Sequence, residues 1–364
     1  MNGKIVFIVS ALSQPRCIKR ITAIAKAGFD CSVYGYDRGM YRCNAYPDNI
    51  KVHTLGSLPS GSGYWAKLLM YKKDIDRIVR ENGRDNVLYY GFGMLASIGL
   101  YLKKVKYAQE ISDIAYAYPS FKRIEPLLRK FDKIIIKRSQ LTVMTSEGFK
   151  QYYDLNDSNI IVQPNKVNVS LINVERKPLP PSCAEHLVFA YVGAIRYDTI
   201  FRFAETIGKY YPQHEYHFYG ESRRDIMQEV DRLVSTYTNV KKYGAFKNPD
   251  DLPSIYNEID VVTACYQVSS LNERIAEPNK LYEAMFFCKP IVVSDGIFLS
   301  EQVKKYGCGF CMDASTEENI RNFVDSLNGK ELSDISHREY SMDTSVSIDN
   351  EETIINRIKT IFKR

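Results

Sequence analysis

Apolar and polar positions follow two different periods along this chain. Runs of about four to eight apolar residues predict buried strands, and apolar positions three or four apart predict amphipathic helices. Strands are expected at Lys4–Val9, Cys31–Tyr36, Ile50–Leu55, Val87–Tyr90, Lys106–Ile111, Leu141–Met144, Ile160–Gln163, Leu187–Val192, Glu215–Tyr219, Val240–Tyr243, Asp260–Ala264 and Ile291–Gly296. Helices are expected at Cys17–Gly28, Tyr64–Arg80, Leu127–Lys137, Ile200–Tyr210, Pro249–Ile259, Ile320–Leu327 and in the tail from Asp349.

The order of these elements predicts the fold class. Strands and helices alternate in both halves, so each half is expected to form a parallel sheet with helices on both faces. Residues 173–186 hold three prolines and show no periodicity, which predicts a linker. We therefore expect an α/β protein of two doubly wound, Rossmann-like domains facing across a cleft. The first domain covers 1–172, the second covers 187–345, and a helix in 346–364 could pack back on the first.

The stretch Ile275–Asp295 carries the most specific chemistry. Pro278 fits the first position of a helix, which places Glu277 at the N-cap. Asn279 and Lys280 then fall in the first turn, and Glu283 lies one turn further on the same face as Asn279. A helix start with free N–H groups, a lysine and a carboxylate suits a diphosphate and a diol, as in a nucleotide-sugar.

Ligands of parallel α/β sheets bind beyond the carboxyl ends of the strands. In the second half, these ends are Gly193–Arg196, Gly220–Glu221, the segment Tyr266–Glu277, and Asp295. The second half is therefore expected to hold the ligand.

Composition and charge narrow the possible partners. The chain is 45% hydrophobic and 25% charged, as a globular protein is, and its eight cysteines fit a reducing compartment. Residues 1–185 hold 28 Lys/Arg and 16 Asp/Glu, a net charge of +12, and the remainder is net −6. The first half is basic but carries no nucleic-acid recognition motif. We therefore expect an anionic membrane surface, and not a nucleic acid, as its binding partner. The longest uncharged run, Val87–Leu102, is shorter than the ~20 residues that span a bilayer.

Three weaker signals have structural alternatives. Gly91-Phe-Gly93-Met-Leu-Ala96 matches the dinucleotide fingerprint GxGxxA, and the alternative is a tight strand-to-helix turn. Tyr64–Arg80 combines a tryptophan with lysines and arginines, which fits an interfacial helix or an ordinary helix packed on the sheet. Asp74-Ile75-Asp76 spells a metal-binding DxD, but it falls inside that same helix pattern.

The stretch Ile275–Asp295 also resembles a segment of a known protein family. EPNKLYEAMFFCKPIVVS is similar to the donor-site segment of the retaining GT-B glycosyltransferases of family 4, of the bacterial polysaccharide type. FAYVGAIR from Phe189 resembles the strand and turn that open that family's donor domain. YGAFKNPDDLPSIYNEIDVV resembles the stretch before the motif, and the first β-α-β unit, with Gln14-Pro15-Arg16, is a weaker match.

This resemblance implies a site and a mechanism. Arg196 and Lys280 would hold the diphosphate, Glu283 would accept hydrogen bonds from the ribose, and Glu277 would touch the transferred sugar. Asp113, at the end of a first-half strand, is the candidate where many family members use a histidine. The donor-binding set is Gly193, Arg196, Gly220, Phe246, Asn279, Lys280, Leu281 and Glu283. No metal and no other cofactor are expected.

Two positions depart from the family pattern. Its two glutamates lie eight residues apart, but Glu277 is six residues before Glu283. The usual lysine after the arginine is replaced by Phe201, so Arg202 or Lys280 could substitute for it.

The resulting expectation is a retaining hexosyltransferase that uses a UDP-sugar rather than a GDP-sugar. Its acceptor would be lipid-linked or a polysaccharide, in bacterial capsule or O-antigen synthesis. The protein would be cytoplasmic and peripheral on the inner face of the membrane. The alternatives are a catalytically degenerate nucleotide-binding scaffold of GT-B fold and an NAD-dependent oxidoreductase.

Overall fold

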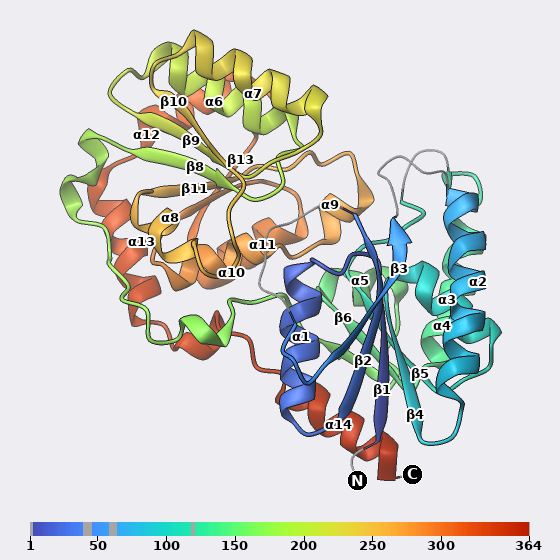
Figure 1. Cartoon of the computed structure of the whole chain (residues 1–364). Helices are drawn as coiled ribbons and strands as arrows, with labels where there is room; N and C mark the ends of the chain where they lie inside the picture. The colour runs from blue at the N-terminus through green and yellow to red at the C-terminus, as the bar shows by residue number, and fades with distance from the viewer. Residues whose placement is uncertain (1–2, 39–45, 58–63, 118–120, 364) are drawn as a thin grey trace. The chain divides into compact units, whose positions relative to one another are not determined.

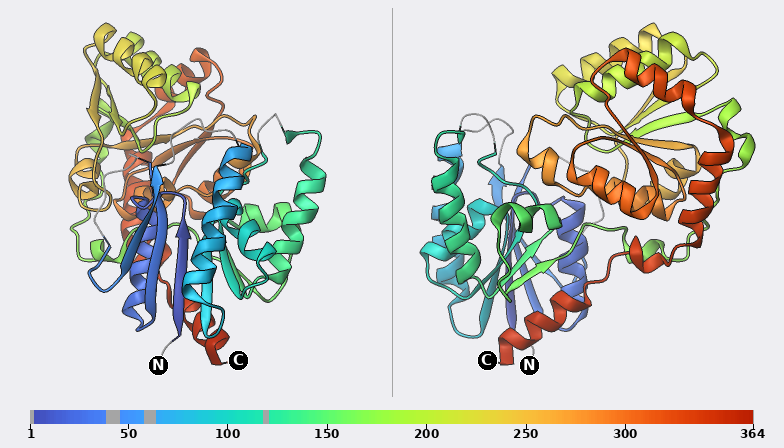
Figure 2. Two further views of the ribbon diagram at one scale, coloured as in Figure 1. Left: turned by 45° about the vertical axis from the view of Figure 1, so that its right-hand side comes forward. Right: turned by 180° about the vertical axis from the view of Figure 1, so that it is seen from behind.

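The computed structural model describes residues 3–38, 46–57, 64–117 and 121–363 (Figure 1). The chain divides into two compact units. Unit 1 is Met1–Pro164 together with Asn350–Arg364, and unit 2 is Asn165–Asp349. The chain therefore passes between the units twice, and its last helix belongs to the unit in which the chain begins (Figure 2).

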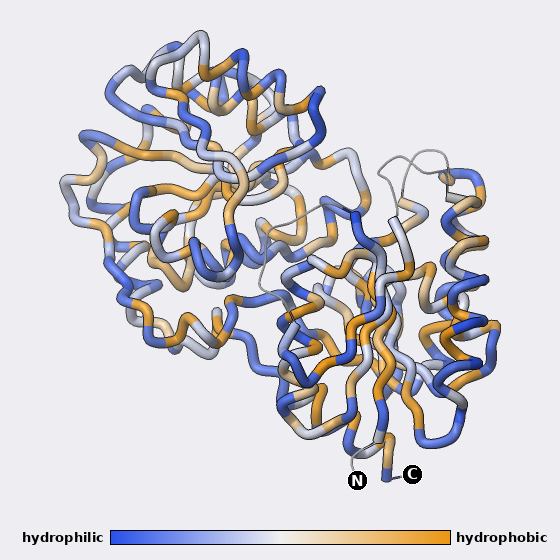
Figure 3. The backbone as a smooth tube through the Cα atoms, in the orientation of Figure 1, coloured by the Kyte–Doolittle hydropathy of each residue, from blue (hydrophilic) through white to orange (hydrophobic). Residues whose placement is uncertain are grey.

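The sheet of unit 1 has seven strands in the order β3-β2-β1-β4-β5-β6-β7, and all its pairings are parallel. The strand order reverses direction between β1 and β4, the switch point of a doubly wound sheet. The strands are β1 (Lys4–Val9), β2 (Asp30–Asp37), β3 (Lys51–Ser57), β4 (Val87–Phe92), β5 (Tyr107–Ile111), β6 (Leu141–Met144) and β7 (Ile160–Val162). The central strands are hydrophobic along their length, as sheets covered on both faces are (Figure 3).

Helices cover both faces of this sheet (Figure 1). They are α1 (Pro15–Lys26), α2 (Tyr64–Asn82), α3 (Met94–Leu102), α4 (Glu125–Arg138), α5 (Glu147–Tyr153) and α14 (Glu352–Lys363). Alternate residues of β1 enter different cores: Ile5 and Phe7 pack with α1 and α14, and Val6 and Ile8 pack with α2 and α3. Ile354 and Ile358 of α14 are fully buried in the first of these cores.

The GxGxxA segment forms a tight strand-to-helix turn, as the structural alternative predicted. It joins β4 to α3, and Gly93 has a φ of +90° just before the helix. A Cβ on Gly91 would lie 3.1 Å from the Cβ of Ala96, so the glycine permits close packing of helix and strand.

The apolar stripe of α2 packs on the sheet. Tyr71, Ile75 and Ile78 are buried in the same core as β1 and β4. The two aspartates of the DxD sequence lie within α2 and have protein partners: Asp74 accepts a hydrogen bond from Tyr36, and Asp76 pairs with Lys103. No helix among the described residues has the length and apolar character needed to cross a membrane.

Unit 2 contains a six-stranded parallel sheet in the order β10-β9-β8-β11-β12-β13. The strands are β8 (Val188–Val192), β9 (Glu215–Tyr219), β10 (Val240–Gly244), β11 (Val261–Ala264), β12 (Ile291–Ser294) and β13 (Gly309–Met312). The helices are α6 (Asp198–Tyr210), α7 (Arg224–Thr236), α8 (Leu252–Asn257), α9 (Leu271–Ile275), α10 (Asn279–Phe286), α11 (Phe298–Tyr306), α12 (Glu317–Ser326) and α13 (Gly329–Ser341).

The segment 173–186, predicted as a linker, packs within unit 2. Its residues Pro181–Glu185 form a short 3-10 helix, and Leu179 and Cys183 are buried in the core of unit 2. The Leu179 N–H donates to Ser336 Oγ at 2.8 Å, which ties the segment to α13. The prolines therefore shape a packed segment, and the chain passes between the units at Pro164–Asn165 instead.

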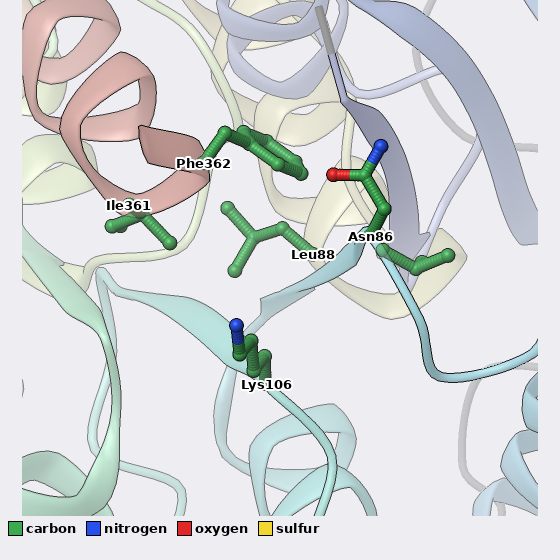
Figure 4. Close-up of a pocket in the computed structure, with 6 residues that line it drawn as sticks. Asn86, Leu88, Lys106, Ile361 and Phe362 are labelled. Carbon is green, nitrogen blue, oxygen red and sulfur yellow. The ribbon is translucent and has the colours of Figure 1, made fainter. Parts of the chain in front are cut away.

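Figure 4 shows a small pocket in unit 1. Asn86, Leu88 and Lys106, at the amino ends of β4 and β5, line it together with Ile361 and Phe362 of α14. It contains none of the predicted site residues, and it lies at the opposite end of the strands from that at which parallel sheets bind ligands.

Candidate functional site

Three glycines stand side by side where β8, β9 and β10 end. The Gly193 N–H donates to the Tyr219 carbonyl at 2.8 Å, and the Gly220 N–H donates to the Gly244 carbonyl at 2.8 Å. Gly193 and Gly220 have φ values of +132° and +131°, which other residue types rarely adopt. A Cβ on Gly220 would lie 2.0 Å from the Gly193 carbonyl oxygen, so no side chain fits there. These strand ends therefore consist of backbone without side chains.

Lys280 reaches this bare edge from the first turn of α10. A Cβ on Gly193 would lie 2.8 Å from its Nζ. The Nζ lies 4.5 Å from the ring centroid of Tyr191 and 5.9 Å from that of Tyr266. Among the described residues, the ammonium group has aromatic faces beside it and no ion pair with a carboxylate.

Burial changes the charge state of this lysine. The side chain of Lys280 is almost fully buried, and burial lowers its pKa to about 8. The negative charge of Glu283 opposes this shift, and the positive charge of Arg196 adds to it. A bound anion would replace the lost hydration and favour the charged form.

Arg196 follows β8 by four residues and is exposed. Its positive charge helps to lower the pKa of Lys280. The other proposed substitute for the missing lysine is already used: Arg202 Nη1 donates to the Ala314 carbonyl at 3.1 Å. Phe201 packs its ring against Phe218. Lys280 is therefore the better candidate for the second cation.

Glu283 is buried and held by three donors. It accepts hydrogen bonds from the Tyr256 hydroxyl at 2.9 Å, from Asn248 Nδ2 at 3.4 Å and from the Asn279 amide. Such donors satisfy a carboxylate that burial removes from water. Tyr256 and Asn248 were not predicted, although both lie in the stretch that resembles the family.

Leu281 and Phe246 have mainly apolar surroundings. Leu281 is fully buried and fixes α10 in the core, and Phe246 is partly buried against the same core. Leu281 could contact a ligand only through its backbone, whereas the side chain of Phe246 stays partly accessible.

Glu277 is not the N-cap of α10, which corrects the sequence-based prediction. The helix starts one residue later, at Asn279, and Pro278 is the N-cap with extended backbone angles of −76° and 149°. Glu277 is buried and accepts a hydrogen bond from the Tyr282 hydroxyl. Lys166 lies with its Nζ 5.6 Å from the Tyr282 ring, and the charge of Glu277 acts on the pKa of this lysine.

Asp113 belongs to a different unit from the other candidates. It lies two residues beyond β5 in unit 1 and is exposed. All the other predicted site residues lie in unit 2. Its predicted role stays a prediction.

Searches with the sequence find no matching family model and no matching curated protein. Solved structures do match along the whole chain. Sucrose-phosphate synthase from Thermosynechococcus elongatus has a TM-score of 0.72 at 16% identity, over 99% of this chain and 98% of that chain. HepE from Anabaena, in complex with UDP and glucose, has a TM-score of 0.66 at 14% identity, over 99% and 98%.

A third match is WaaG, a glycosyltransferase involved in lipopolysaccharide biosynthesis. Its TM-score is 0.66 at 12% identity, over 97% of this chain and 99% of that chain. The chain has the GT-B fold. The predicted fold class of two Rossmann-like α/β domains is confirmed. One end of the second sheet of this GT-B chain brings together Gly193, Gly220, Lys280 and Glu283. At sequence identities of 12–16%, the similar structures support the fold and not the roles of these residues.

Proposed function

We propose that this chain is a retaining glycosyltransferase that transfers a hexosyl group from a UDP-sugar. One observation carries the proposal: the buried ammonium group of Lys280 faces bare strand ends at a helix start, one turn from the buried carboxylate of Glu283. A cation and helix N–H groups suit a diphosphate, and a carboxylate suits the ribose hydroxyls. One solved structure of similar fold, HepE, is in complex with UDP-glucose.

In this mechanism, the diphosphate lies against Gly193 and Gly220 and is held by Lys280, Arg196 and the start of α10. Negative charge grows on the leaving diphosphate as the sugar–oxygen bond breaks. Preorganised cations stabilise that charge more in the transition state than in the ground state. The acceptor hydroxyl attacks the face from which the diphosphate leaves, a phosphate oxygen takes its proton, and the configuration is retained.

The remaining residues have supporting roles in this proposal. Glu283 accepts hydrogen bonds from the ribose, Glu277 contacts the transferred sugar, and Asp113 acts on the acceptor side. Arg196 and Lys280 supply positive charge at the diphosphate, so we propose that the reaction needs no metal.

We further propose a lipid-linked or polysaccharide acceptor, in bacterial capsule or O-antigen synthesis. The basic first half supports an anionic membrane surface as a partner, with the protein peripheral on its cytoplasmic face. One protein of similar fold, WaaG, is involved in lipopolysaccharide biosynthesis.

A thermal-shift titration with UDP, GDP and NAD tests the donor proposal. A ligand at a hundredfold excess over its Kd stabilises the protein by ~2.7 kcal/mol. We expect stabilisation by UDP, a smaller effect of GDP and none by NAD. Stabilisation by NAD alone would reject the proposal. A screen of UDP-sugars for slow hydrolysis would then identify the transferred sugar.

A degenerate nucleotide-binding scaffold is the second candidate. Two departures from the family pattern favour it: the six-residue spacing between Glu277 and Glu283, and Phe201 in place of a lysine. The two candidates differ in turnover. UDP binding without hydrolysis or transfer of any UDP-sugar would support the scaffold.

A further inference from the structure

The helix α4 of unit 1 presents an outer face that combines apolar side chains with cations. Leu127 and Ile134 lie two turns apart on this face and are 68% and 47% exposed. Ile124, the N-cap residue of the helix, is 45% exposed. A contiguous row of exposed apolar residues with a polar rim is a mark of a protein or membrane interaction site.

Cations surround this apolar ridge. Lys130, Lys137 and Arg138 are exposed on α4, and Lys122 and Arg123 are exposed just before it. Residues 122–138 contain seven Lys/Arg and two Asp/Glu. The outer face is therefore strongly positive as well as apolar.

Both acidic residues of α4 turn inward. Glu125 accepts a hydrogen bond from Tyr152, and Asp132 accepts hydrogen bonds from Tyr116 and Tyr153. Asp132 is 4% exposed, and burial raises its pKa to about 6. Neither carboxylate neutralises the outer cations.

The rest of α4 is firmly packed. Ile135 and Ile136 are fully buried, and the Tyr107 hydroxyl donates to the Ile135 carbonyl. The outer face is thus presented by a helix that is already formed, so docking would not require an ordering step.

The helix α2, which the sequence marked as an interfacial candidate, is less suited to this task. Its main apolar stripe is buried against the sheet, and its exposed apolar residues include Leu69 and Met70. Arg77 of α2 pairs with Asp74 and Glu81, and these two carboxylates reduce the net positive charge of the helix surface.

We propose that the outer face of α4, formed by Ile124, Leu127, Lys130, Ile134, Lys137 and Arg138, docks on the surface of an anionic lipid bilayer. The apolar residues enter the headgroup region, and the cations pair with lipid phosphates. Two copies of this chain would repel each other through these cations, and a nucleic acid would leave the isoleucines and leucine in water. The inference specifies the proposed membrane partner and does not depend on transfer activity.

Flotation with vesicles tests the proposal. We expect the full chain to bind vesicles of phosphatidylglycerol and phosphatidylcholine, to bind phosphatidylcholine vesicles weakly, and to lose binding as salt rises. The variant Lys130→Gln/Lys137→Gln should weaken binding by about fivefold per cation, or roughly 25-fold in total. Leu127→Ser/Ile134→Ser should weaken it by at least about tenfold.

Matched control variants distinguish specific binding through α4 from a general effect of surface charge or of exposed apolar residues. Lys72→Gln/Lys73→Gln removes two exposed cations from α2, and Val169→Ser/Ile172→Ser removes two exposed apolar residues from unit 2. We expect both to bind vesicles within about twofold of wild type. All the substituted residues are exposed, so a thermal melt should show unchanged folding.

Equal losses from the α2 and α4 lysine pairs would overturn the assignment to α4 and indicate general charge attraction. Full binding by Leu127→Ser/Ile134→Ser would overturn apolar insertion. Dimerisation in the absence of lipid that those substitutions abolish would reassign the face to a second copy of the chain. A Lys280→Met variant should bind vesicles as wild type does, even if the proposed transfer activity is never found.

Discussion

Lys280 brings a charge into the interior of unit 2 without an ion-pair partner among the described residues. Burial of an unpaired charge destabilises a protein, and such arrangements concentrate at functional sites. Burial lowers the pKa of Lys280 to about 8. A diphosphate beside the Nζ would return the pKa toward its usual value near 10.4.

This shift would make the proposed UDP binding depend on pH. Below about 8 the lysine is charged in both the free and the bound protein, and above 8 the free protein must take up a proton to bind. We expect UDP affinity to be about tenfold weaker at pH 9 than at pH 7. Calorimetry in buffers of different ionisation enthalpy would show the proton uptake. Lys280→Arg is the control, because arginine stays charged over this range. A wild-type affinity that does not change with pH would contradict the model.

Glu277 and Glu283 are each held by a buried tyrosine hydroxyl. We expect Tyr256→Phe to weaken UDP binding by roughly tenfold, since it loosens the carboxylate assigned to the ribose. Tyr282→Phe should instead lower kcat and leave UDP affinity nearly unchanged, since Glu277 is assigned to the sugar. Titration calorimetry and steady-state kinetics on both variants measure this difference. Equal effects of the two substitutions on UDP affinity would refute the separate roles.

At the scale of elements, a buried ion network joins α14 to the first sheet. Arg20 of α1 pairs with Glu110 of β5 at 3.0 Å and with Glu351, the residue before α14. Arg16 also pairs with Glu110, at 3.1 Å. The side chains of Arg20 and Glu110 are fully buried, so each charge depends on the other.

We expect Arg20→Met to lower the free energy of unfolding by about 3–5 kcal/mol, because it leaves Glu110 buried without its main partner. Arg16→Met should lower it less, because that side chain is partly exposed. Urea denaturation followed by circular dichroism compares the two. A loss below about 1 kcal/mol in Arg20→Met would show that the network contributes little.

The accuracy of sequence-based prediction also differs between elements. The patterns predicted β1, β6 and β9 with the observed bounds, because each is a short run of mainly apolar or aromatic residues between turns. They did not predict α13. Its large buried apolar residues are Leu332 and Ile335, and the small polar residues Ser333 and Ser336 occupy other buried positions of the helix. Serines give no apolar period, and their burial follows from hydrogen bonds to Leu179 and the Cys288 carbonyl.

At the scale of the whole molecule, each of the two units has its own core. We expect UDP at a hundredfold excess over its Kd to stabilise unit 2 by ~2.7 kcal/mol. Ile358→Ala, which removes a fully buried side chain of α14, should destabilise unit 1 by about 2–5 kcal/mol, and the milder Ile358→Val by about 0.5–1.5 kcal/mol. Scanning calorimetry should show different transitions responding. A single transition that responds equally to both changes would contradict independent unfolding.

Several features of this protein were determined by its sequence alone. Strand and helix periods gave the two α/β halves, and Asn279, Lys280 and Glu283 stood together at a predicted helix start because they are close along the chain. Local chemistry of this kind is visible in a sequence because helix geometry relates neighbouring residues directly.

Other features were decided by tertiary structure. Gly193, Gly220 and Gly244 meet because parallel pairing aligns the ends of strands far apart in the sequence. Tertiary packing also brings Tyr256 and Asn248 to Glu283 and returns α14 to unit 1. It turns the acidic residues of α4 inward and leaves cations of this helix on the outside. Such contacts depend on which surfaces pack together, and packing joins residues that no local period connects.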